Sequence, residues 1–306
     1  MNHVFCAMIS LGVVLYLTGS AKADVIFDFK SIDVPGSNFT QAFKINDFGQ
    51  IVGDYRVPPN SVDHGYLLSG NTYFKLDVDS ANGINNSGQI VGETGNDGFL
   101  LSGGNYTTLD VPGSTFTQPV GINDAGQIVG VYGAGSNHGF LLSGGAYSTL
   151  DVPGATYTQP NDINDSGQIV GYYVSSGLFH GFVLNAAGYS TLDFPGSTFT
   201  RAYGINDAGL MVGDYEDVNG SRHGFLLSGG NYTTVEFPGA NFTIASGINN
   251  AGQIVGEYAS GTTGGFLAVP VPEPHVFTSF MIGSLTLVAF ACQRQYRASR
   301  RDSQTY

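Results

Sequence analysis

The chain has 306 residues, of which 42% are hydrophobic and only 11% are charged, so it is long enough to bury one large core or two ordinary ones. Its 45 glycines and few lysines indicate a turn-rich β protein rather than a helical one. Between Asp24 and Val269 there are 22 Asp and Glu against 6 Lys and Arg, a net charge of −16. That charge excludes nucleic acid and anionic lipid as partners. Cysteine occurs only at Cys6 and Cys292, in the terminal segments, which excludes disulfides, cysteine-ligated zinc and a cysteine nucleophile in between.

The N-terminal segment has the pattern of a secretory signal. Residues 4–17 are apolar but too short to span a membrane comfortably, and Ala21-Lys22-Ala23 has the small-x-small pattern of a cleavage site. We predict a signal peptide over residues 1–23, removed after Ala23 by signal peptidase. The alternative is an uncleaved membrane anchor.

Residues 24–269 consist of six repeats. The string Ile-Asn-(Asp/Asn)-x-Gly recurs with its Ile at 45, 84, 122, 163, 205 and 248, at spacings of 39, 38, 41, 42 and 43 residues. A His-Gly-Phe-Leu-Leu-Ser-Gly-Gly string and a Leu-Asp-Val-Pro-Gly string, each with variants, also occur six times. Repetition at this period indicates a single domain of six similar units.

The turn residues divide each repeat into four short strands. Asn123-Asp124-Ala125-Gly126 fits a type I turn that closes on a left-handed Gly, and Ser143-Gly144-Gly145 supplies a second hairpin turn. Segments rich in Val, Ile, Tyr, Phe and Thr lie between these turns, as expected for strands. About 41 residues and four antiparallel strands is the size of a β-propeller blade.

The two ends of the repeat region favour a closed ring. The region opens on a fourth strand (Ile26 to Val34) and closes on a third strand (Gly265 to Val269), so the N-terminal strand is expected to complete the last blade. We predict an all-β, six-bladed β-propeller of four-stranded blades, with a β-solenoid as the alternative. A glycine in every second strand is expected where the backbone crowds the central axis: Gly53, Gly92, Gly130, Gly171, Gly213 and Gly256.

These strings resemble the HAF repeats of bacterial extracellular proteins, whose His-Ala-Phe motif reads His-Gly-Phe here. The resemblance covers nearly the whole repeat region and rests equally on Gly-Ile-Asn-Asp-x-Gly-Gln-Ile-Val-Gly. It implies export and a repeat architecture, because the family is defined by these and not by a reaction.

Two sets of equivalent side chains are candidates for a site in the repeats. A histidine opens the third strand at His64, His138, His180 and His223, and either a metal ring or a structural tie to a neighbouring turn explains it. We favour the structural role, because two repeats carry Asp97 and Gly264 instead. A carboxylate ends the fourth strand in every copy, and we interpret it as turn capping and edge protection: Asp33, Asp77, Asp110, Asp151, Asp193 and Glu236.

The remaining polar deviations give no catalytic motif. Asp47, Asp124, Asp165 and Asp207 are interpreted as turn formers, because they lack the Asx-x-Asx ladder of a calcium loop. Arg201 and the pair Glu216-Asp217 are interpreted as loop variation. We therefore predict no catalytic residue, no metal ligand and no cofactor, and calcium stays open without a clear motif to support it.

The C-terminal tail, residues 270–306, predicts a membrane helix. Residues 276–292 carry no charge and span roughly 25 Å as a helix. Arg294, Arg297, Arg300 and Arg301 follow, so the positive-inside rule places the C-terminus in the cytoplasm and the repeats outside. The alternative is a buried apolar helix of the repeat domain.

Pro272-Glu273-Pro274, the apolar helix and the arginine cluster together resemble the PEP-CTERM sorting tails of Gram-negative bacteria. The resemblance implies an exosortase-type transpeptidase that recognises Pro272, Glu273 and Pro274 and removes the helix, after transient anchoring in the inner membrane. We expect an exported protein that is anchored by this helix with its repeats outside the cytoplasm and is then found at the cell surface or outside the cell.

Two functions fit these features. The first is a non-enzymatic surface or matrix protein whose acidic propeller binds extracellular polysaccharide or a surface protein. The second is a secreted carbohydrate-active enzyme, which requires one asymmetric pocket with paired carboxylates.

Overall fold

The computed structural model describes residues 25–59 and 62–271, which form 24 β-strands and no helix. Four consecutive repeats each form a separate antiparallel meander. The second repeat contains β6 (Ser80–Ile84), β7 (Ile90–Thr94), β8 (Asp97–Ser102) and β9 (Asn105–Leu109). The third contains β10 (Phe116–Ile122), β11 (Ile128–Gly133), β12 (Asn137–Ser143) and β13 (Ala146–Leu150). The fourth contains β14 (Tyr157–Ile163), β15 (Ile169–Ser175), β16 (Leu178–Asn185) and β17 (Gly188–Leu192). The fifth contains β18 (Phe199–Ile205), β19 (Met211–Glu216), β20 (Arg222–Ser228) and β21 (Asn231–Val235).

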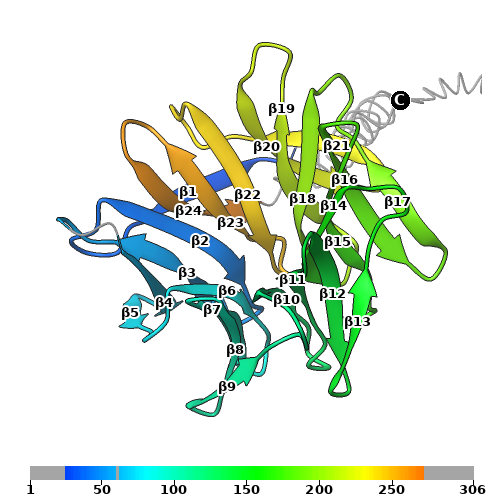
Figure 1. The fold of residues 1–306 in the computed structure, drawn as a ribbon. Helices are drawn as coiled ribbons and strands as arrows, with labels where there is room; N and C mark the ends of the chain where they lie inside the picture. The colour runs from blue at the N-terminus through cyan, green and yellow to red at the C-terminus, as the bar shows by residue number, and fades with distance from the viewer. Residues whose placement is uncertain (1–24, 60–61, 272–306) are drawn as a thin grey trace, which may run out of the picture.

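The first and sixth repeats share one eight-stranded sheet. Its first-repeat strands are β2 (Phe39–Ile45), β3 (Ile51–Arg56), β4 (Asp63–Ser69) and β5 (Thr72–Lys75). Its sixth-repeat strands are β22 (Phe242–Ile248), β23 (Ile254–Ala259) and β24 (Thr263–Pro270), with β1 (Phe27–Ile32) added from the N-terminal end. The sheets radiate from a common axis as the blades of a β-propeller (Figure 1).

This arrangement corrects the predicted set of six separate four-stranded blades. Four blades are separate sheets, and a parallel bridge between Phe39 of β2 and Thr263 of β24 merges the strands of the other two repeats. The connection from β1 to β2 makes the same turn hydrogen bond as the connections between other repeats, from the N–H of Ser37 to the carbonyl of Val34, so it does not explain the merger. The β-solenoid alternative is also wrong, because all the strand pairs apart from this bridge are antiparallel.

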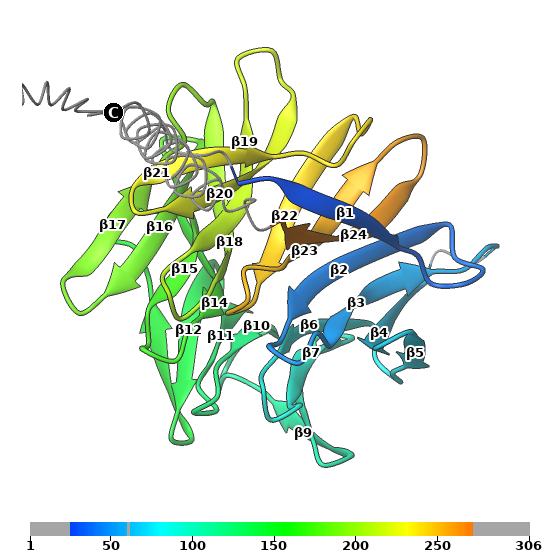
Figure 2. The same cartoon turned by 180° about the vertical axis from the view of Figure 1, so that it is seen from behind.

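The predicted role of the N-terminal strand is confirmed. β1 pairs with β24 in antiparallel register from Phe27↔Pro270 to Ile32↔Gly265. Figure 2 shows β1 lying along β24 at this seam. The pairing supplies the missing fourth strand of the last repeat and satisfies the backbone groups of an edge that an open array would expose.

The core lies between consecutive repeats. Each second strand has a glycine at the same position, and the valine before it is fully buried. That valine packs into the apolar cluster of the next repeat around the ring. These residues are Val52, Val91, Val129, Val170, Val212 and Val255. Because every repeat buries its face against its neighbour, no repeat has a complete core of its own.

The first predicted hairpin turn is present in all six repeats. In the third repeat Gly126 has φ +74°, and its N–H donates to the Asn123 carbonyl at 3.0 Å. The Asn123 side chain accepts a hydrogen bond from the N–H of Gln127 at 2.9 Å and donates to the carbonyl of Asn164 in the next repeat at 3.1 Å. The same asparagine-to-carbonyl bond runs around the ring and closes from Asn249 to Asn46 at 3.1 Å: Asn46, Asn85, Asn123, Asn164, Asn206 and Asn249 are its donors.

Several predictions fall outside the described residues. These are the signal peptide with Ala21 and Ala23, the sorting motif Pro272, Glu273 and Pro274, the helix over 276–292, and the cluster Arg294, Arg297, Arg300 and Arg301. Within residues 25–59 and 62–271, no helix has the length and apolar character needed to cross a membrane. The predicted fold with a transmembrane helix, and the location anchored by that helix, are corrected accordingly. The sorting resemblance stays a prediction.

Candidate functional site

The six inner strands enclose one asymmetric pocket on the propeller axis. Each of β2, β6, β10, β14, β18 and β22 contributes side chains to a cavity of about 390 Å³. The polar lining includes Asn82, Gln118, Gln159, Asn161 and Ser246, and the charged lining includes Lys44, Arg201, Arg222 and Glu257. These side chains differ from repeat to repeat, so the pocket does not have the symmetry of the backbone around it.

Lys44 lines this pocket at the axis and forms an ion pair with Asp162, which lies behind it in the lining of the smaller cavity. Lys44 of the first repeat lies 3.0 Å from the carboxylate of Asp162 in the fourth repeat, which is the opposite repeat of a six-membered ring. Lys44 Nζ also donates to the carbonyl of Tyr203, and Asp162 accepts from the N–H of Ile205 at 3.1 Å. Burial lowers the pKa of Lys44, and Asp162 opposes that effect.

The other four repeats have glycine where Lys44 and Asp162 stand. The inner strands approach each other so closely here that a Cβ at Gly83 would lie 2.7 Å from the carbonyl oxygen of Val120. Two oppositely charged side chains therefore occupy the narrow axis, and together they close it. Lys44 also lines the smaller cavity beyond, of about 70 Å³, together with Asp162.

The narrow end of the channel carries a ring of Asp and Asn side chains. Each of these residues accepts a hydrogen bond from the backbone N–H of its equivalent in the preceding repeat, at 2.8–2.9 Å: Asp47, Asn86, Asp124, Asp165, Asp207 and Asn250. Asp47, Asp124, Asp165 and Asp207 thus link repeats, whereas the sequence indicated a role within each turn. Inside the turn, the preceding asparagine does the capping.

Two arginines on one wall share a buried carboxylate. Asp214 of β19 has a side chain that is 0% exposed. Arg201 donates to both of its oxygens, through Nε at 3.1 Å and Nη2 at 2.8 Å. Arg222 donates to Oδ2 through Nε at 2.9 Å and Nη2 at 2.5 Å. Two guanidinium groups and one carboxylate leave one net positive charge on this wall of the pocket.

Aromatic rings surround Arg201. Its guanidinium carbon lies 4.8 Å from the ring centre of Phe199, 5.6 Å from that of Tyr203 and 5.8 Å from those of Tyr172 and Phe179. These are cation–π distances, and they fix the side chain in one orientation. Tyr203 lines the pocket beside Arg201, and burial raises its pKa well above its ordinary value.

A carboxylate follows the second-strand glycine in four repeats: Asp54, Glu93, Asp214 and Glu257. Glu257 accepts a hydrogen bond from Gln41 of the next repeat, and Glu93 accepts one from Gln118 at 2.8 Å. The third such carboxylate, Asp54, faces a repeat in which Ser80 stands in place of that glutamine. Among the described residues Asp54 Oδ1 is the one buried side-chain oxygen or nitrogen without a hydrogen-bond partner, and burial raises the pKa of Asp54 to about 7.

The histidines and the strand-end carboxylates, predicted as two separate sets, meet in three repeats. His138 lies 2.7 Å from Asp151, His180 lies 3.1 Å from Asp193, and His223 lies 2.5 Å from Glu236. Each pair ties the start of the third strand to the end of the fourth. The predicted structural role of these histidines is thereby confirmed at those three positions. His64 instead contacts the ring of Tyr55, with centroids 5.5 Å apart.

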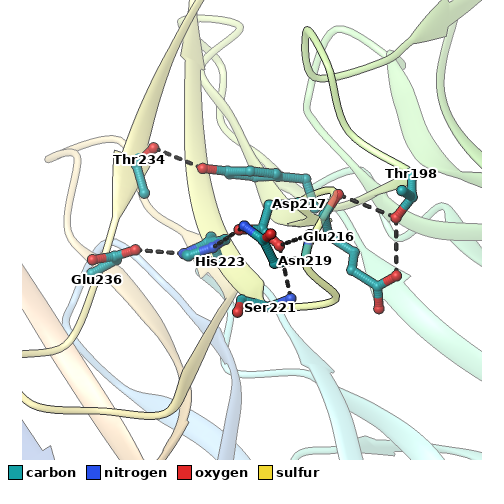
Figure 3. A network of polar contacts seen from close by, with 9 residues as sticks. Thr198, Glu216, Asp217, Asn219, Ser221, His223, Thr234 and Glu236 are labelled. Atoms are coloured by element: carbon teal, nitrogen blue, oxygen red, sulfur yellow. Dashed lines mark hydrogen bonds and ion pairs between the residues drawn. The ribbon is translucent and has the colours of Figure 1, made fainter.

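Glu216 and Asp217 lie in the network of Figure 3, outside the channel. Asp217 accepts hydrogen bonds from the N–H groups of Asn219 at 2.8 Å and Ser221 at 2.9 Å, and it lies 3.6 Å from His223. The bond from Ser221 is the main reason that the pKa of Asp217 is lowered. Asp217 is loop variation, as predicted, whereas Glu216 is the last residue of β19 and is paired with β18 and β20.

For Arg201 the interpretation as loop variation is wrong, since Arg201 lies on β18 and lines the channel pocket. The sequence interpretation also passed over Lys44 and Asp162. A signal for all three exists in the aligned repeats, because each breaks the repeat pattern with a charge. Lys44 and Asp162 replace the glycine before Ile-Asn, and Arg201 replaces a Gln, Ser or Ile.

No protein-family model and no curated protein matches the sequence. Among solved structures, the chain is similar to TolB from Acinetobacter baumannii, with 14% identity and a TM-score of 0.50, over 69% of this chain and 55% of that one. It is also similar to a streptogramin B lyase, with 10% identity and a TM-score of 0.48 over 78% and 97% of the two chains. A fucose-specific lectin from Aleuria aurantia gives 13% identity and a TM-score of 0.49 over 81% and 100%. At these identities the likeness to TolB shows the fold alone, a β-propeller.

Proposed function

We propose that the protein is a non-enzymatic binding protein whose propeller holds a small saccharide unit of an extracellular polysaccharide in the channel pocket. The observation that carries the proposal is the pocket itself. It breaks the symmetry of the repeats, is lined at the axis by Lys44, which pairs with Asp162, and has a volume of about 390 Å³. Pockets of roughly 300–1,000 Å³ are typical of small-ligand sites.

The composition of the lining supports a saccharide. Four amide side chains from three repeats supply both donors and acceptors, and Phe43 and Tyr203 supply apolar surface beside them. Sugars present hydroxyl groups around their edge and C–H groups on their faces, so they need both kinds of surface.

The carboxylates support binding rather than hydrolysis. Glycoside hydrolysis by the usual route needs two carboxyl groups at the reacting bond. Among the described residues that line the pocket, Glu257 is the only one with a carboxylate. Asp162 and Asp214 lie nearby, and both are held by cations.

Glycan-array screening followed by calorimetry tests the proposal with a pocket-filling variant, Val120→Trp. Val120 lines the pocket, so the variant is expected to lose binding of whichever glycan the wild type retains. The matched control is Val218→Trp, at a residue that is 79% exposed. Equal binding by both variants, or a mass-spectrometric change in the bound oligosaccharide, contradicts the proposal.

A further inference from the structure

We infer that the group recognised in the channel pocket is the carboxylate of an acidic sugar, held between Arg201 and Arg222. The inference rests on the proposed function and names the ligand class for that pocket. It follows from the free N–H donors of the two arginines, from the contacts that fix their orientation and from the polar groups beside them.

The two arginines are oriented and still have free donors. Each uses Nε and Nη2 toward Asp214, and neither Nη1 donates to any of the described residues. Asp214 and the aromatic rings around Arg201 already fix both guanidinium planes. A ligand therefore loses little binding free energy to the ordering of these side chains. A planar carboxylate is the anion that matches such fixed N–H donors.

The charged groups at the pocket are matched in number before a ligand enters. Three cations, Lys44, Arg201 and Arg222, stand beside the three carboxyl groups of Asp162, Asp214 and Glu257. The two free Nη1 groups, rather than a net charge, therefore select a planar carboxylate. A dianion would place a second negative charge beside Asp214 and Glu257.

Two polar groups beside the arginines distinguish a sugar acid from a simple carboxylic acid. Glu257 uses Oε2 to accept from Gln41, and its Oε1 has no partner among the described residues. The hydroxyl of Tyr203 is likewise without a hydrogen bond to them, although it lines the same pocket. A ligand with both a carboxylate and hydroxyl groups can use the arginines and these two groups, whereas acetate can use only the arginines.

Calorimetry with four probes tests the inference on the wild-type protein: methyl galacturonoside, methyl glucuronoside, methyl galactoside and acetate. We expect at least one uronate to bind about tenfold or more tightly than methyl galactoside, as for a charge-assisted hydrogen bond, and acetate to bind far more weakly than that uronate.

Arg222→Gln is expected to lower the affinity for the uronate by about tenfold or more, and to lower the affinity for methyl galactoside by a much smaller factor. Arg56→Gln is the matched control, because Arg56 pairs with Asp63 outside the pocket and its loss changes the net charge equally. Arg222→Lys keeps the positive charge but loses the planar set of N–H donors. Its affinity for the uronate is expected to lie between those of Arg222→Gln and Arg56→Gln. Circular dichroism melting confirms that each variant is folded.

The possible failures are distinguishable. If the neutral sugar binds as tightly as either uronate, the carboxylate inference is wrong and the proposed function stands. If acetate binds as tightly as the uronates, the site takes simple carboxylic acids and both the inference and the saccharide proposal fail. If no probe and no array glycan binds, the proposed function itself is wrong.

Discussion

At the scale of single residues, one repeat has a serine where others have a glutamine, and a buried carboxylate thereby loses its hydrogen-bond donor. In two repeats a glutamine of the next repeat donates to the carboxylate at this position, Glu257 or Glu93. Ser80 is too short to do so, and its hydroxyl donates to Asn82 instead. Asp54 is therefore desolvated without such a donor. Burial raises the pKa of all three carboxyl groups, and the glutamines oppose this rise only at Glu93 and Glu257.

This carboxylate predicts a pH dependence of stability. The pKa of Asp54 is raised from 3.8 to about 7 in the folded protein. Between these values the folded state binds a proton that the unfolded state does not. The stabilisation is therefore complete below about pH 4 and is lost as the pH rises through about 7. Asparagine at position 54 does not ionise, so the variant Asp54→Asn does not lose stability in this way as the pH rises. It should be more stable than wild type by roughly 2–4 kcal/mol at pH 8 and nearly equal to it at pH 4.

Urea unfolding at pH 4.5 and pH 8 checks this prediction. Asp28→Asn serves as the control, because Asp28 is an exposed carboxylate on β1 and its loss changes the net charge in the same way. A stability difference for Asp54→Asn that is the same at both pH values would show that the cause is packing and not ionisation.

At the scale of the element, every repeat has a bulge in its inner strand opposite the second-strand glycine. In the third repeat the register of β10 and β11 shifts between Pro119 and Gly121, next to the pair Pro119↔Gly130. A Cβ at Gly130 would lie 2.1 Å from the carbonyl oxygen of Gln118 and 2.9 Å from the ring of Phe140. The predicted crowding at this glycine is real. Its cause is the paired strand of the same sheet, not the distant sides of the axis.

The two kinds of glycine in a repeat should therefore respond differently to alanine. Gly130→Ala forces backbone atoms apart and is expected to destabilise the fold by about 3 kcal/mol or more. The methyl group of Gly145→Ala meets no atom within 4 Å. This variant is destabilised only by placing an alanine in the left-handed conformation at φ +82°, which costs about 1–2 kcal/mol. Denaturant titration of both variants measures the difference. Equal losses would mean that the inner strand moves to accommodate the methyl group.

At the scale of the whole molecule, the ring depends on its seam. β1 is far from β24 in sequence and pairs with its outer edge from Gly265 to Pro270. Phe29 of β1 also packs against Phe237 and Phe266, with ring centroids 5.7 Å apart in both cases. The seam thus joins the ends of the chain by backbone hydrogen bonds and by apolar contacts.

A chain that begins at residue 34 should lose cooperative unfolding and aggregate, because the edge of β24 is exposed. A permuted chain in which residues 25–33 follow residue 271 through a short turn should recover it, because the register Phe27↔Pro270 places the two segments as a hairpin. Thermal unfolding followed by circular dichroism compares the two chains. Failure of the permuted chain to recover would mean that the N-terminal position of β1 matters, and not only its pairing.

The sequence by itself determined the features that repeat. The period of the Ile-Asn strings, the glycine pairs and the Pro-Gly breaks identify four short strands per repeat and a strand exchanged between the ends, because turn chemistry and strand pairing are local. The propeller and the pairing of β1 with β24 followed from them. The merger of the first and last repeats into one sheet did not, since a single bridge between Phe39 and Thr263 has no local signal.

The location of the site depends on long-range contacts. Lys44 and Asp162 are 118 positions apart, and no repeat pattern pairs them. They meet because closure of the ring brings opposite repeats to one axis and leaves room there for only a few side chains. Arg201 and Asp214 are cross-strand partners within one hairpin, but only the closed ring makes Arg201 and Arg222 part of the pocket. What the repeats share forms the scaffold, and what differs between them at that axis forms the pocket.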